Sequence, residues 1–500
     1  LFVDANGDPV GLYPTQGDIM DSTSLGLLVK SVWHYAEDAS LAFMLNDFDL
    51  ERNGDFRSVN GNRSLGILTG TEAGEPSALV GDPARNEVTT ASLTWRKAQL
   101  AGGSVSAQLF DQSYRALFEG GTFAGFFRLT PDGPDFLDQS AVVSDKQGLK
   151  LTWNRPLDAA GSQLTLGLDW YRDDSAQVLA RSGREWVPET RFESLAPFVQ
   201  ASWALTDALT LSGGLRLEDA ELRVDDYVTI ASAGSTPVGG GSPSFSETLP
   251  NLGLVWRLAE DWSVYASYGE GFTMPDVGRV LRAVSTPGLD VGSLIAVEPI
   301  VSDNRELGLE WNPGNLRARI AVFDSTADNG SLLRLNPQGI FEVERQRTEI
   351  DGVEVSMEYL WDSGWLLGGN YSHSNGRFDS DNDGRVDSDL DGLNIGPNRF
   401  NLYLQGEIAP EWSLRAQGAL LSDRDFDGLA SSGNANFDGY SLVDLILAWD
   451  SPVGRLSLGV ENLFDRQYVT YFSQVETGQR NDTYFAGSGR SLSLGWQRSF

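Results

Sequence analysis

The sequence predicts an all-β protein, a transmembrane antiparallel up-and-down β-barrel, from three observations. Apolar and polar residues alternate through many short segments, and the connections between these segments are short and long in turn. No run approaches the roughly 18 apolar residues that a membrane helix needs. Because only helices and closed barrels satisfy their backbone hydrogen bonds in lipid, a membrane protein with this sequence has to be a barrel.

The alternation is clearest in Gly489–Phe500, at the end of the chain. Leu492, Leu494 and Trp496 fall on one parity, and small or polar residues fall on the other. A period of two predicts an extended strand, since successive side chains point to opposite faces. Arg498 interrupts the apolar parity, but its long stem can carry the charge to the membrane edge. A closing strand that ends on an aromatic residue is similar to the C-terminal signature of bacterial outer-membrane barrels.

The same alternation recurs along the whole chain. Its polar parity carries Gln, Arg, Glu and Asp as well as Ser. A dry sandwich core would not tolerate these residues unpaired, whereas a water-filled lumen would. We count roughly 19 such segments. Their lengths are consistent with the roughly 9–11 residues that a tilted strand needs to cross lipid. They centre near Leu28, Phe43, Leu93, Gln108, Leu149, Leu166, Phe198, Leu211, Leu252, Tyr265, Leu307, Ile320, Val355, Gly368, Leu402, Ala416, Leu445, Leu458 and Leu494.

The connections alternate strictly between tight turns and long loops, as the two rims of a transmembrane barrel do. The short connections are Tyr35–Asp38, Leu100–Gly103, Thr206–Ala208, Ala259–Asp261, Asn312–Gly314, Asp362–Gly364, Pro410–Glu411 and Ser451–Gly454. The long ones are Glu51–Val88, Phe118–Val142, Arg223–Ser246, Gly271–Val301, Gly376–Gly396, Asp423–Gly439 and Asp465–Ser488. Tryptophans at strand ends, most of them near short turns, predict an interfacial girdle at the periplasmic rim. These are Trp95, Trp153, Trp170, Trp256, Trp311, Trp361, Trp449 and Trp496.

We expect residues 1–500 to form one barrel domain that lacks its first strands. If the last strand descends to the periplasm, an odd number of strands makes the first visible strand descend too. Leu1 to Thr23 would then be the remains of an extracellular loop. A closed bacterial barrel normally has an even number of strands, so at least one is expected to be missing upstream. Residue 1 is Leu and no signal peptide is visible, which indicates a mature, truncated or fragmentary chain.

Composition excludes several functions. The chain carries 70 acidic and 37 basic residues, a formal net charge of −33, which argues against nucleic-acid binding through a basic surface. The absence of cysteine excludes disulfides, thiolate metal sites and cysteine nucleophiles. The two histidines, His34 and His373, are expected at opposite ends of the barrel and cannot act together. No nucleophile elbow, phosphate loop or zinc signature is present, so the sequence predicts no enzyme.

Several stretches resemble the TonB-dependent outer-membrane receptors, especially the ferric-siderophore branch. The most specific is Asn462-Leu-Phe-Asp465 within Glu461–Tyr468, followed by the aromatic end of the chain. The others are Tyr268–Asp276, Asn304–Gly308, Ile350–Glu354 and Gly489–Leu494. The resemblance covers the whole chain as barrel only. It implies a barrel of about 22 strands, of which about 19 are visible here.

This resemblance implies a monomeric, multi-pass protein of the bacterial outer membrane, in contact with lipid and lipopolysaccharide. Its implied function is to bind a ferric siderophore and transport it actively, with Fe³⁺ only as siderophore-bound cargo. Family members take energy from TonB and its inner-membrane motor through an N-terminal plug. The plug is absent from the sequence, so we expect it to belong to a longer chain or, as the weaker alternative, to another polypeptide.

The acidic stretch Asp379–Gly392 is the sharpest local motif. Carboxylates at alternate positions, followed by glycine, can wrap a hard cation with oxygen ligands. The spacing resembles the first part of an EF-hand loop, but Leu390 stands at the position of the bidentate Glu. It looks closer to the acidic calcium loops of thrombospondin-like repeats. A solvated loop tip is the alternative, since Asp-Gly is ordinary turn chemistry. We expect a structural Ca²⁺, with candidate ligands Asp379, Asp381, Asp383, Arg385 through its carbonyl, Asp387, Asp389 and Asp391.

Cargo contacts are expected from the long loops and the upper lumen. Aromatic side chains can stack on a catecholate or hydroxamate ligand, and arginine can offset its negative charge. Ordinary loop packing explains each residue alone at least as well. The candidates are Tyr114, Arg115, Phe118, Phe123, Phe126, Trp186, Phe272, Met274, Arg279, Arg282, Tyr471 and Phe472.

Two alternatives to siderophore transport stay open. The cargo could be vitamin B12, haem, another metal chelate or an oligosaccharide, although a chain with two histidines is a poor haem candidate. The barrel could also be a passive pore or an adhesin-like protein, which would lack the stretches that resemble the receptor family.

Overall fold

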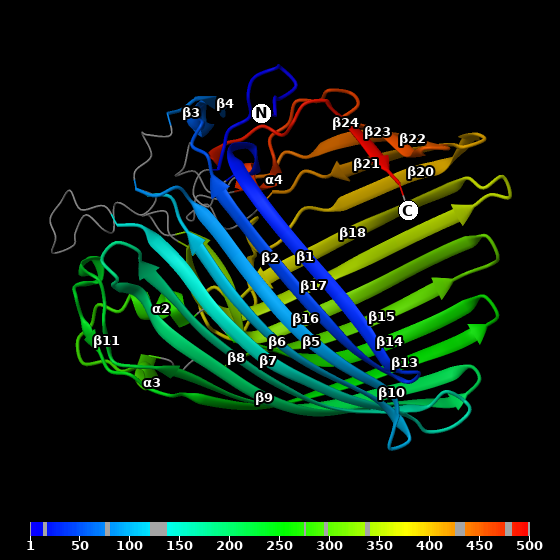
Figure 1. The fold of residues 1–500 in the computed structure, drawn as a ribbon, viewed down its shortest axis with the longest axis horizontal. Helices are drawn as coiled ribbons and strands as arrows, with labels where there is room; N and C mark the ends of the chain where they lie inside the picture. Colours follow the sequence, from blue (N-terminus) through cyan, green and yellow to red (C-terminus); the bar gives the residue numbers. More distant parts are fainter. Residues whose placement is uncertain are drawn as a thin grey trace.

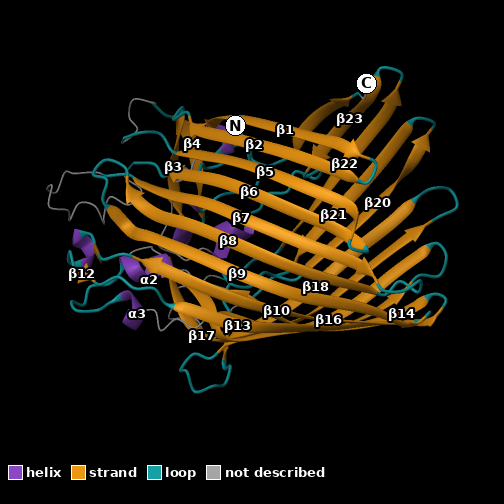
Figure 2. Ribbon diagram, turned by 60° about the horizontal axis from the view of Figure 1, so that its bottom comes forward, coloured by secondary structure: helices purple, strands orange, loops and turns teal. Residues whose placement is uncertain are grey.

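The structure is a computed structural model. It describes residues 2–13, 18–75, 81–120, 138–274, 277–294, 299–335, 341–425, 436–475 and 483–498. Its main feature is a sheet of 20 strands in which sequential strands pair antiparallel. The sheet curls round on itself to form a barrel wall (Figures 1 and 2). None of the helices in the described part of the chain is long and apolar enough to cross a membrane.

The sheet contains one two-residue strand, β19 (Ser388–Asp389), so 19 of its 20 strands are long. Each of the 19 predicted centres lies inside a different long strand, which confirms the predicted strand order. The long strands are β1 (Ser22–Ala36), β2 (Ala39–Arg52), β5 (Arg85–Leu100), β6 (Gly103–Leu117), β7 (Ser140–Pro156), β8 (Gln163–Leu179), β9 (Glu185–Thr206), β10 (Leu209–Val224), β13 (Ser244–Ala259), β14 (Trp262–Thr273), β15 (Ile300–Trp311), β16 (Leu316–Leu335), β17 (Phe341–Leu360), β18 (Leu366–Phe378), β20 (Arg399–Ala409), β21 (Trp412–Leu421), β22 (Tyr440–Ser451), β23 (Gly454–Glu461) and β24 (Ser491–Gln497).

Cross-strand pairing separates the two faces of the wall. Residues directly opposite each other in an antiparallel pair lie on the same face. Leu307 pairs with Val322, and both are about half exposed, so this parity is the outer face. Apolar side chains cover it along strand after strand, as the alternation predicts. The barrel therefore presents a hydrophobic exterior of the kind that faces lipid.

The two rims differ as predicted. Tight turns join the strands at the right of Figure 1, and long loops gather at the left. The loops hold the hairpins β3–β4 and β11–β12 and several short helices. These elements are β3 (Phe56–Asn62), β4 (Ile67–Ala73), β11 (Tyr227–Val228), β12 (Pro237–Val238), η2 (Ile19–Asp21), η3 (Arg63–Leu65), η5 (Ala231–Ala233), α2 (Val277–Arg282), α3 (Val291–Leu294) and α4 (Tyr471–Val475).

The tight-turn rim carries stacked tryptophans on neighbouring strands. Trp262 and Trp311 have ring centroids 5.2 Å apart, and Trp412 and Trp449 have centroids 5.5 Å apart. Each pair is directly opposite in the sheet. Indole rings suit a membrane interface because one edge is polar and the body is apolar.

The buried apolar residues gather among the long loops rather than inside the barrel. One cluster joins β18 to the loops that follow it and to α4. A second cluster joins the end of β10 to α2 and α3. The members of the first are Phe378, Leu390, Ile395, Phe437 and Val475, and those of the second are Leu222, Val224, Val277, Leu281 and Val291. The loops therefore form a packed layer over one rim.

The first and last long strands are not paired with each other in the described part of the chain. β1 pairs only with β2, and β24 only with β23. The layer of loops nevertheless links the two sides, because residues 2–13 contact the loop before β24. The Gly489 N–H donates to the Val3 carbonyl over 2.8 Å, and Gln467 Nε2 donates to Asp4 Oδ2 over 2.7 Å.

Candidate functional site

The interior wall of the barrel is lined by polar and aromatic side chains that neighbouring strands bring together. Since Leu307 and Val322 face outward, the adjacent pair of Glu306 and Phe323 faces the interior. The same alternation places Glu358 on the interior wall, directly opposite Arg317. The lumen is therefore bounded by charged groups that compensate one another, as a wet passage requires.

One interior group combines Tyr265 of β14, Glu306 of β15 and Arg319 of β16. The Tyr265 hydroxyl donates to the Glu306 carboxylate, and Arg319 Nε donates to that hydroxyl over 2.9 Å. The guanidinium carbon of Arg319 lies 4.9 Å from the ring centroid of Tyr265, and its Nη2 lies 3.0 Å from Glu306 Oε1. Gly308 leaves the space under the ring, because a Cβ there would overlap it. The guanidinium is thus held flat against the wall.

A second interior group repeats this arrangement on other strands. The Tyr403 hydroxyl of β20 donates to Glu358 of β17. The guanidinium carbon of Arg415 lies 4.5 Å from the Tyr403 ring centroid, and its Nη1 donates to Gln405 Oε1 over 2.8 Å. Gly368 lies under the ring, as Gly308 does in the first group. Cation–π contact of this kind fixes a positive charge without burying it.

A cavity of about 540 Å³ lies between the two groups on the interior wall. Arg317 and Arg319 line it together with Glu310 and Glu358, so the positive and negative side chains of its lining are equal in number. Sequence reasoning did not identify these residues as a site. Their polar parity was visible, but the partner of each residue depends on strand register, which alternation alone does not specify.

Tyr471, predicted to contact cargo, lies in α4 within the loop layer. Its hydroxyl donates to the carbonyls of Gly392 and Ile395, each over 2.8 Å. Its ring packs edge-on against Phe437, with centroids 4.9 Å apart. Burial raises the pKa of Tyr471 to about 12. The side chain therefore fastens α4 to the loop that follows β18.

Three more cargo candidates lie close together at the other side of the loop layer. Trp186 is 3% exposed and packs with Leu179 and Ile230. The guanidinium carbon of Arg282 lies 4.6 Å from the Trp186 ring, and its Nη1 donates to Gln177 Oε1 over 3.3 Å. Arg279 lies on the same short helix, α2. The structure thus brings Trp186 and Arg282 together.

The other candidates are scattered. Tyr114 lies on the interior face of β6, whereas Arg115 is on the outer face, 3.9 Å from Glu87. Phe272 shares the outer parity of β14 with Ala266. Phe118 follows β6, Met274 follows β14, and Phe472 is about half exposed in α4. Phe123 and Phe126 lie outside the described residues. The cargo role of all these residues stays a prediction.

The acidic loop after β18 brings three of its carboxylates together. Asp379, Asp381 and Asp383 each offer an oxygen, and these atoms lie within 4.8 Å of one another. Asp379 is buried and accepts the N–H of Gly384 over 2.7 Å. Gly384 has a φ of 89°, a left-handed conformation that glycine adopts without strain. The loop thus turns its carboxylates toward one point.

The remaining predicted calcium ligands have other contacts. The Asp387 carboxylate accepts the N–H of Ser380 over 3.0 Å, and Asp391 accepts the N–H of Leu393 over 3.0 Å. Asp389 pairs with Arg377 in the sheet. The Arg385 N–H donates to Asp383 Oδ1 over 2.9 Å, and the ligand roles of these four residues stay predictions.

Electrostatics favour an ionised acidic loop. Burial opposes the charge of Asp379, but the backbone N–H groups of Gly384 and Asp383 outweigh it and lower the pKa of the carboxyl. The N–H and hydroxyl of Ser380 likewise lower the pKa of Asp387. A cluster of ionised carboxylate oxygens is the donor set that Ca²⁺ prefers. The residues present therefore fit a hard cation.

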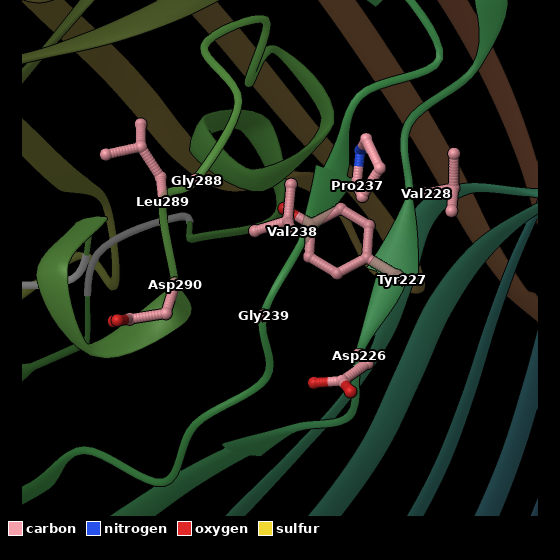
Figure 3. Close-up of a pocket in the computed structure, with 9 residues that line it drawn as sticks. All are labelled: Asp226, Tyr227, Val228, Pro237, Val238, Gly239, Gly288, Leu289 and Asp290. Atoms are coloured by element: carbon pink, nitrogen blue, oxygen red, sulfur yellow. The ribbon is translucent and has the colours of Figure 1, made fainter.

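Figure 3 shows a groove of about 580 Å³ in the loop layer, between the hairpin β11–β12 and the segment Gly288–Asp290. The Tyr227 hydroxyl donates to the Leu281 carbonyl over 2.9 Å, and burial raises the pKa of Tyr227 to about 12. Asp226 accepts the N–H of Gly240 over 2.6 Å. The first bond ties the hairpin to α2, and the second joins the two ends of the hairpin, so both help to build the loop layer.

The wall, the two rims and the polar interior define a transmembrane receptor-like barrel. Residues 35–463 match the model of one protein family, described as TonB dependent receptor-like, beta-barrel. The match spans most of the chain. The protein therefore belongs to this family, as the motifs of its sequence predict, and members of the family are receptors of the bacterial outer membrane.

Individual relatives are similar over the full chain. The ferric aerobactin receptors of Klebsiella pneumoniae and Escherichia coli are 26% and 25% identical, and each alignment covers 100% of this chain and 72% of the receptor. Among solved structures, the copper transporter OprC superimposes with a TM-score of 0.75 at 17% identity, covering 98% of this chain and 72% of OprC. At that identity the superposition shows a shared fold.

Proposed function

We propose that this protein is an outer-membrane receptor that binds a ferric siderophore and imports it by TonB-dependent active transport. The observation that carries the proposal is the similarity of this whole chain to 72% of the length of ferric aerobactin receptors, together with its membership of the TonB-dependent receptor-like barrel family. Ferric iron is then substrate, bound within its siderophore. The energy comes from TonB and its inner-membrane motor.

The geometry suits this role in three ways. The apolar outer face fits a multi-pass position in the bacterial outer membrane, with the barrel acting as a monomer among lipid and lipopolysaccharide. The loop layer provides a surface on the long-loop side to which cargo can bind. On the interior wall, Arg319 and Arg415 are held over tyrosine rings, Arg319 with Glu306 beside it, so the wall presents guanidinium groups of fixed position to an anionic chelate.

Iron uptake tests the proposal directly. A strain that lacks the receptor gene is grown without iron and supplied with radiolabelled ferric aerobactin or with other ferric siderophores, one at a time. We expect uptake of at least one to fall to background and to return when the full-length gene is restored. Uptake that is unchanged for every siderophore would defeat the proposal. Loss of vitamin B12, haem or copper uptake instead would reassign the cargo, and loss of adhesion alone would indicate an adhesin-like barrel.

We also propose that the acidic loop binds one structural Ca²⁺ through Asp379, Asp381 and Asp383. The support is the convergence of their carboxylate oxygens and the lowered pKa of Asp379. Sites of this exposure in extracellular modules have dissociation constants of about 0.1–1 mM. Calorimetry should show one such site in the full-length protein, absent from an Asp381→Asn/Asp383→Asn double variant. The control is Asp207→Asn, an exposed aspartate in a tight turn at the other rim. Absence of calcium heat in the unmodified protein at millimolar metal would remove this site.

A further inference from the structure

The interior face of the first five long strands is basic. These strands, β1, β2, β5, β6 and β7, are neighbours in one part of the wall (Figure 1). Phe43, Leu93 and Leu109 share one cross-strand row and are 41–56% exposed, so their parity is the outer face. The other parity faces the lumen, and we call it the basic sector. Its charged residues are Lys30, Arg52, Arg96, Lys146 and Lys150.

The basic sector contains no carboxylate. Every Asp and Glu of these five strands, all of which the structure describes, lies on the outer parity: Asp47, Asp49, Glu51, Glu87, Asp111 and Asp145. On β15 to β17, by contrast, the interior face carries glutamates beside its arginines, such as Glu306 beside Arg319. A chain with a net charge of −33 therefore keeps one side of its lumen positive.

Three of the five basic side chains have no charged partner. Arg52 Nε lies 3.4 Å from Asp21 Oδ2, and Lys146 Nζ lies 3.4 Å from Asp173 Oδ2 of β8. Lys30, Arg96 and Lys150 are exposed and make no hydrogen bond or ion pair with any other described residue. Charge of one sign that is gathered on a concave wall attracts ions of the opposite sign. These three groups are thus open to an anion in the lumen.

The basic residues follow the strands from the long-loop side toward the tight-turn rim. Lys146 is opposite Gln112, Lys150 is opposite Gln108 two rows further on, and Arg96 is opposite Ser106 in the next row. Two strands and one row separate Arg96 from Lys150, which puts their Cα atoms about 12 Å apart. Long side chains can reach one bound molecule across that distance. Between them lie the amide and hydroxyl groups of Ser106, Gln108 and Thr152.

We propose that the ferric siderophore crosses the lumen along the basic sector as an anionic chelate, and that Arg96 and Lys150 hold it last before the tight-turn rim. The inference rests on the proposed function and adds a route to it. Charge complementarity favours this side, since the carboxylates on β15 to β17 would repel the same chelate. Single basic groups at intervals suit a moving cargo, because passage needs several weak sites rather than one tight site.

Import by the full-length receptor in cells tests this route. The probe is a radiolabelled ferric siderophore that the unmodified receptor imports, with ferric aerobactin as the first to be used. We expect Arg96→Gln/Lys150→Gln to lower the initial rate of import at least fivefold. Binding of the same siderophore to de-energised cells should change less than twofold, because it takes place at the loop layer. Arg96→Lys/Lys150→Arg keeps both charges and should restore at least half of the rate.

The matched control is Lys97→Gln/Arg155→Gln. It removes two charges from the same strands, β5 and β7, but on the outer parity, so import should stay unchanged. Resistance of the folded barrel to sodium dodecyl sulfate confirms that each variant has folded. If the control lowers import as much as Arg96→Gln/Lys150→Gln does, the position of the charges inside the barrel is not what matters, and the inference is wrong.

Other outcomes would also overturn the route. They are unchanged import in Arg96→Gln/Lys150→Gln, no recovery in the variant that keeps the charges, and an equal fall in binding and import. Unchanged import together with entry of a large antibiotic that the outer membrane normally excludes would show that the basic sector holds a plug instead. An unmodified receptor that imports no ferric siderophore would contradict the proposed function, and the route would fall with it.

Discussion

Gly308 and Gly368 show how single residues shape the interior wall. Each lies beneath a tyrosine ring of the neighbouring strand, Tyr265 or Tyr403, and each ring supports an arginine. A side chain at the glycine would fill the space that the ring occupies. The glycine therefore fixes the position of the ring, and the ring fixes the charge above it.

Gly308→Ala should destabilise the barrel because its methyl group overlaps the ring of Tyr265. Overpacking of this kind costs about 1–3 kcal/mol, which a lower thermal unfolding temperature in detergent would report. Gly418→Ala is the control, since the nearest atom to its added Cβ is 3.7 Å away. Equal unfolding temperatures for the two variants would show that the Tyr265 ring is not held as described.

The hydroxyl of Tyr471 gives a pH-dependent contact. Its pKa is raised to about 12 by burial, while an unfolded tyrosine titrates near 10. A raised pKa in the folded state means that the stabilisation is complete below pH of about 10 and is lost as the pH rises through about 12. Absorbance at the tyrosinate band should show several late-titrating tyrosines, Tyr227 among them, and Tyr471→Phe should remove one of them. A normal titration of every tyrosine would contradict the buried contact.

For single residues, the sequence predicted the region in which the cargo candidates lie better than the contacts that their side chains make. Tyr471 and Arg282 lie in the long loops and Trp186 lies at the long-loop end of β9, on the side where cargo contacts were expected. Their printed contacts are with the loop layer and with the strand ends next to it. Tyr265 and Arg319 were not singled out. The reason is physical: a contact between residues 54 positions apart depends on the register of three strands, and a one-residue shift would move each side chain to the other face.

At the level of elements, strand alternation predicted the fold almost completely. All 19 predicted centres lie in separate strands, because a period of two is imposed by lipid on one side and water on the other. The hairpins β3–β4 and β11–β12 were not predicted. They lie in the long loops, where no face is constrained by the membrane, so the sequence contains no comparable periodic signal.

The two faces of one strand should respond oppositely to charge. Ile320→Arg places a guanidinium in the middle of the outer apolar band, where Ile320 is paired with Leu309 and Val355. In a lipid bilayer this should cost about 2–4 kcal/mol, measured as a shift in denaturant unfolding. Ser267→Arg, which faces the interior opposite Glu306, should change stability little. Similar losses from both substitutions would mean that the faces are wrongly assigned.

On the scale of the whole molecule, the protein is inverted relative to a soluble domain. Large apolar side chains such as Leu252, Leu307 and Leu402 are about half exposed on the outside. Charged side chains line the inside, and buried apolar clusters lie mainly in the loop layer. Neither the size of the chain nor its net charge of −33 reveals this inversion; the alternation of residues does.

Removal of detergent should therefore cause the protein to aggregate despite its high net charge. Without detergent or lipid, the exposed apolar band can be removed from water only by contact between protein molecules. Light scattering after detergent dilution should rise, whereas dilution into lipid nanodiscs should leave the protein monodisperse. A protein that stayed monomeric in plain buffer would contradict the membrane-facing assignment of the outer wall.

The stacked tryptophans at the tight-turn rim carry one more consequence. Trp262 on Trp311 and Trp412 on Trp449 each join neighbouring strands in direct opposition, and their planes are inclined by only 17° and 7°. Indoles held this way couple their electronic transitions, so each pair should give a split circular-dichroism band. Sliding either strand by one position would part the rings and extinguish the signal. The growth of this circular-dichroism band would therefore report the assembly of the barrel in real time, without any added dye.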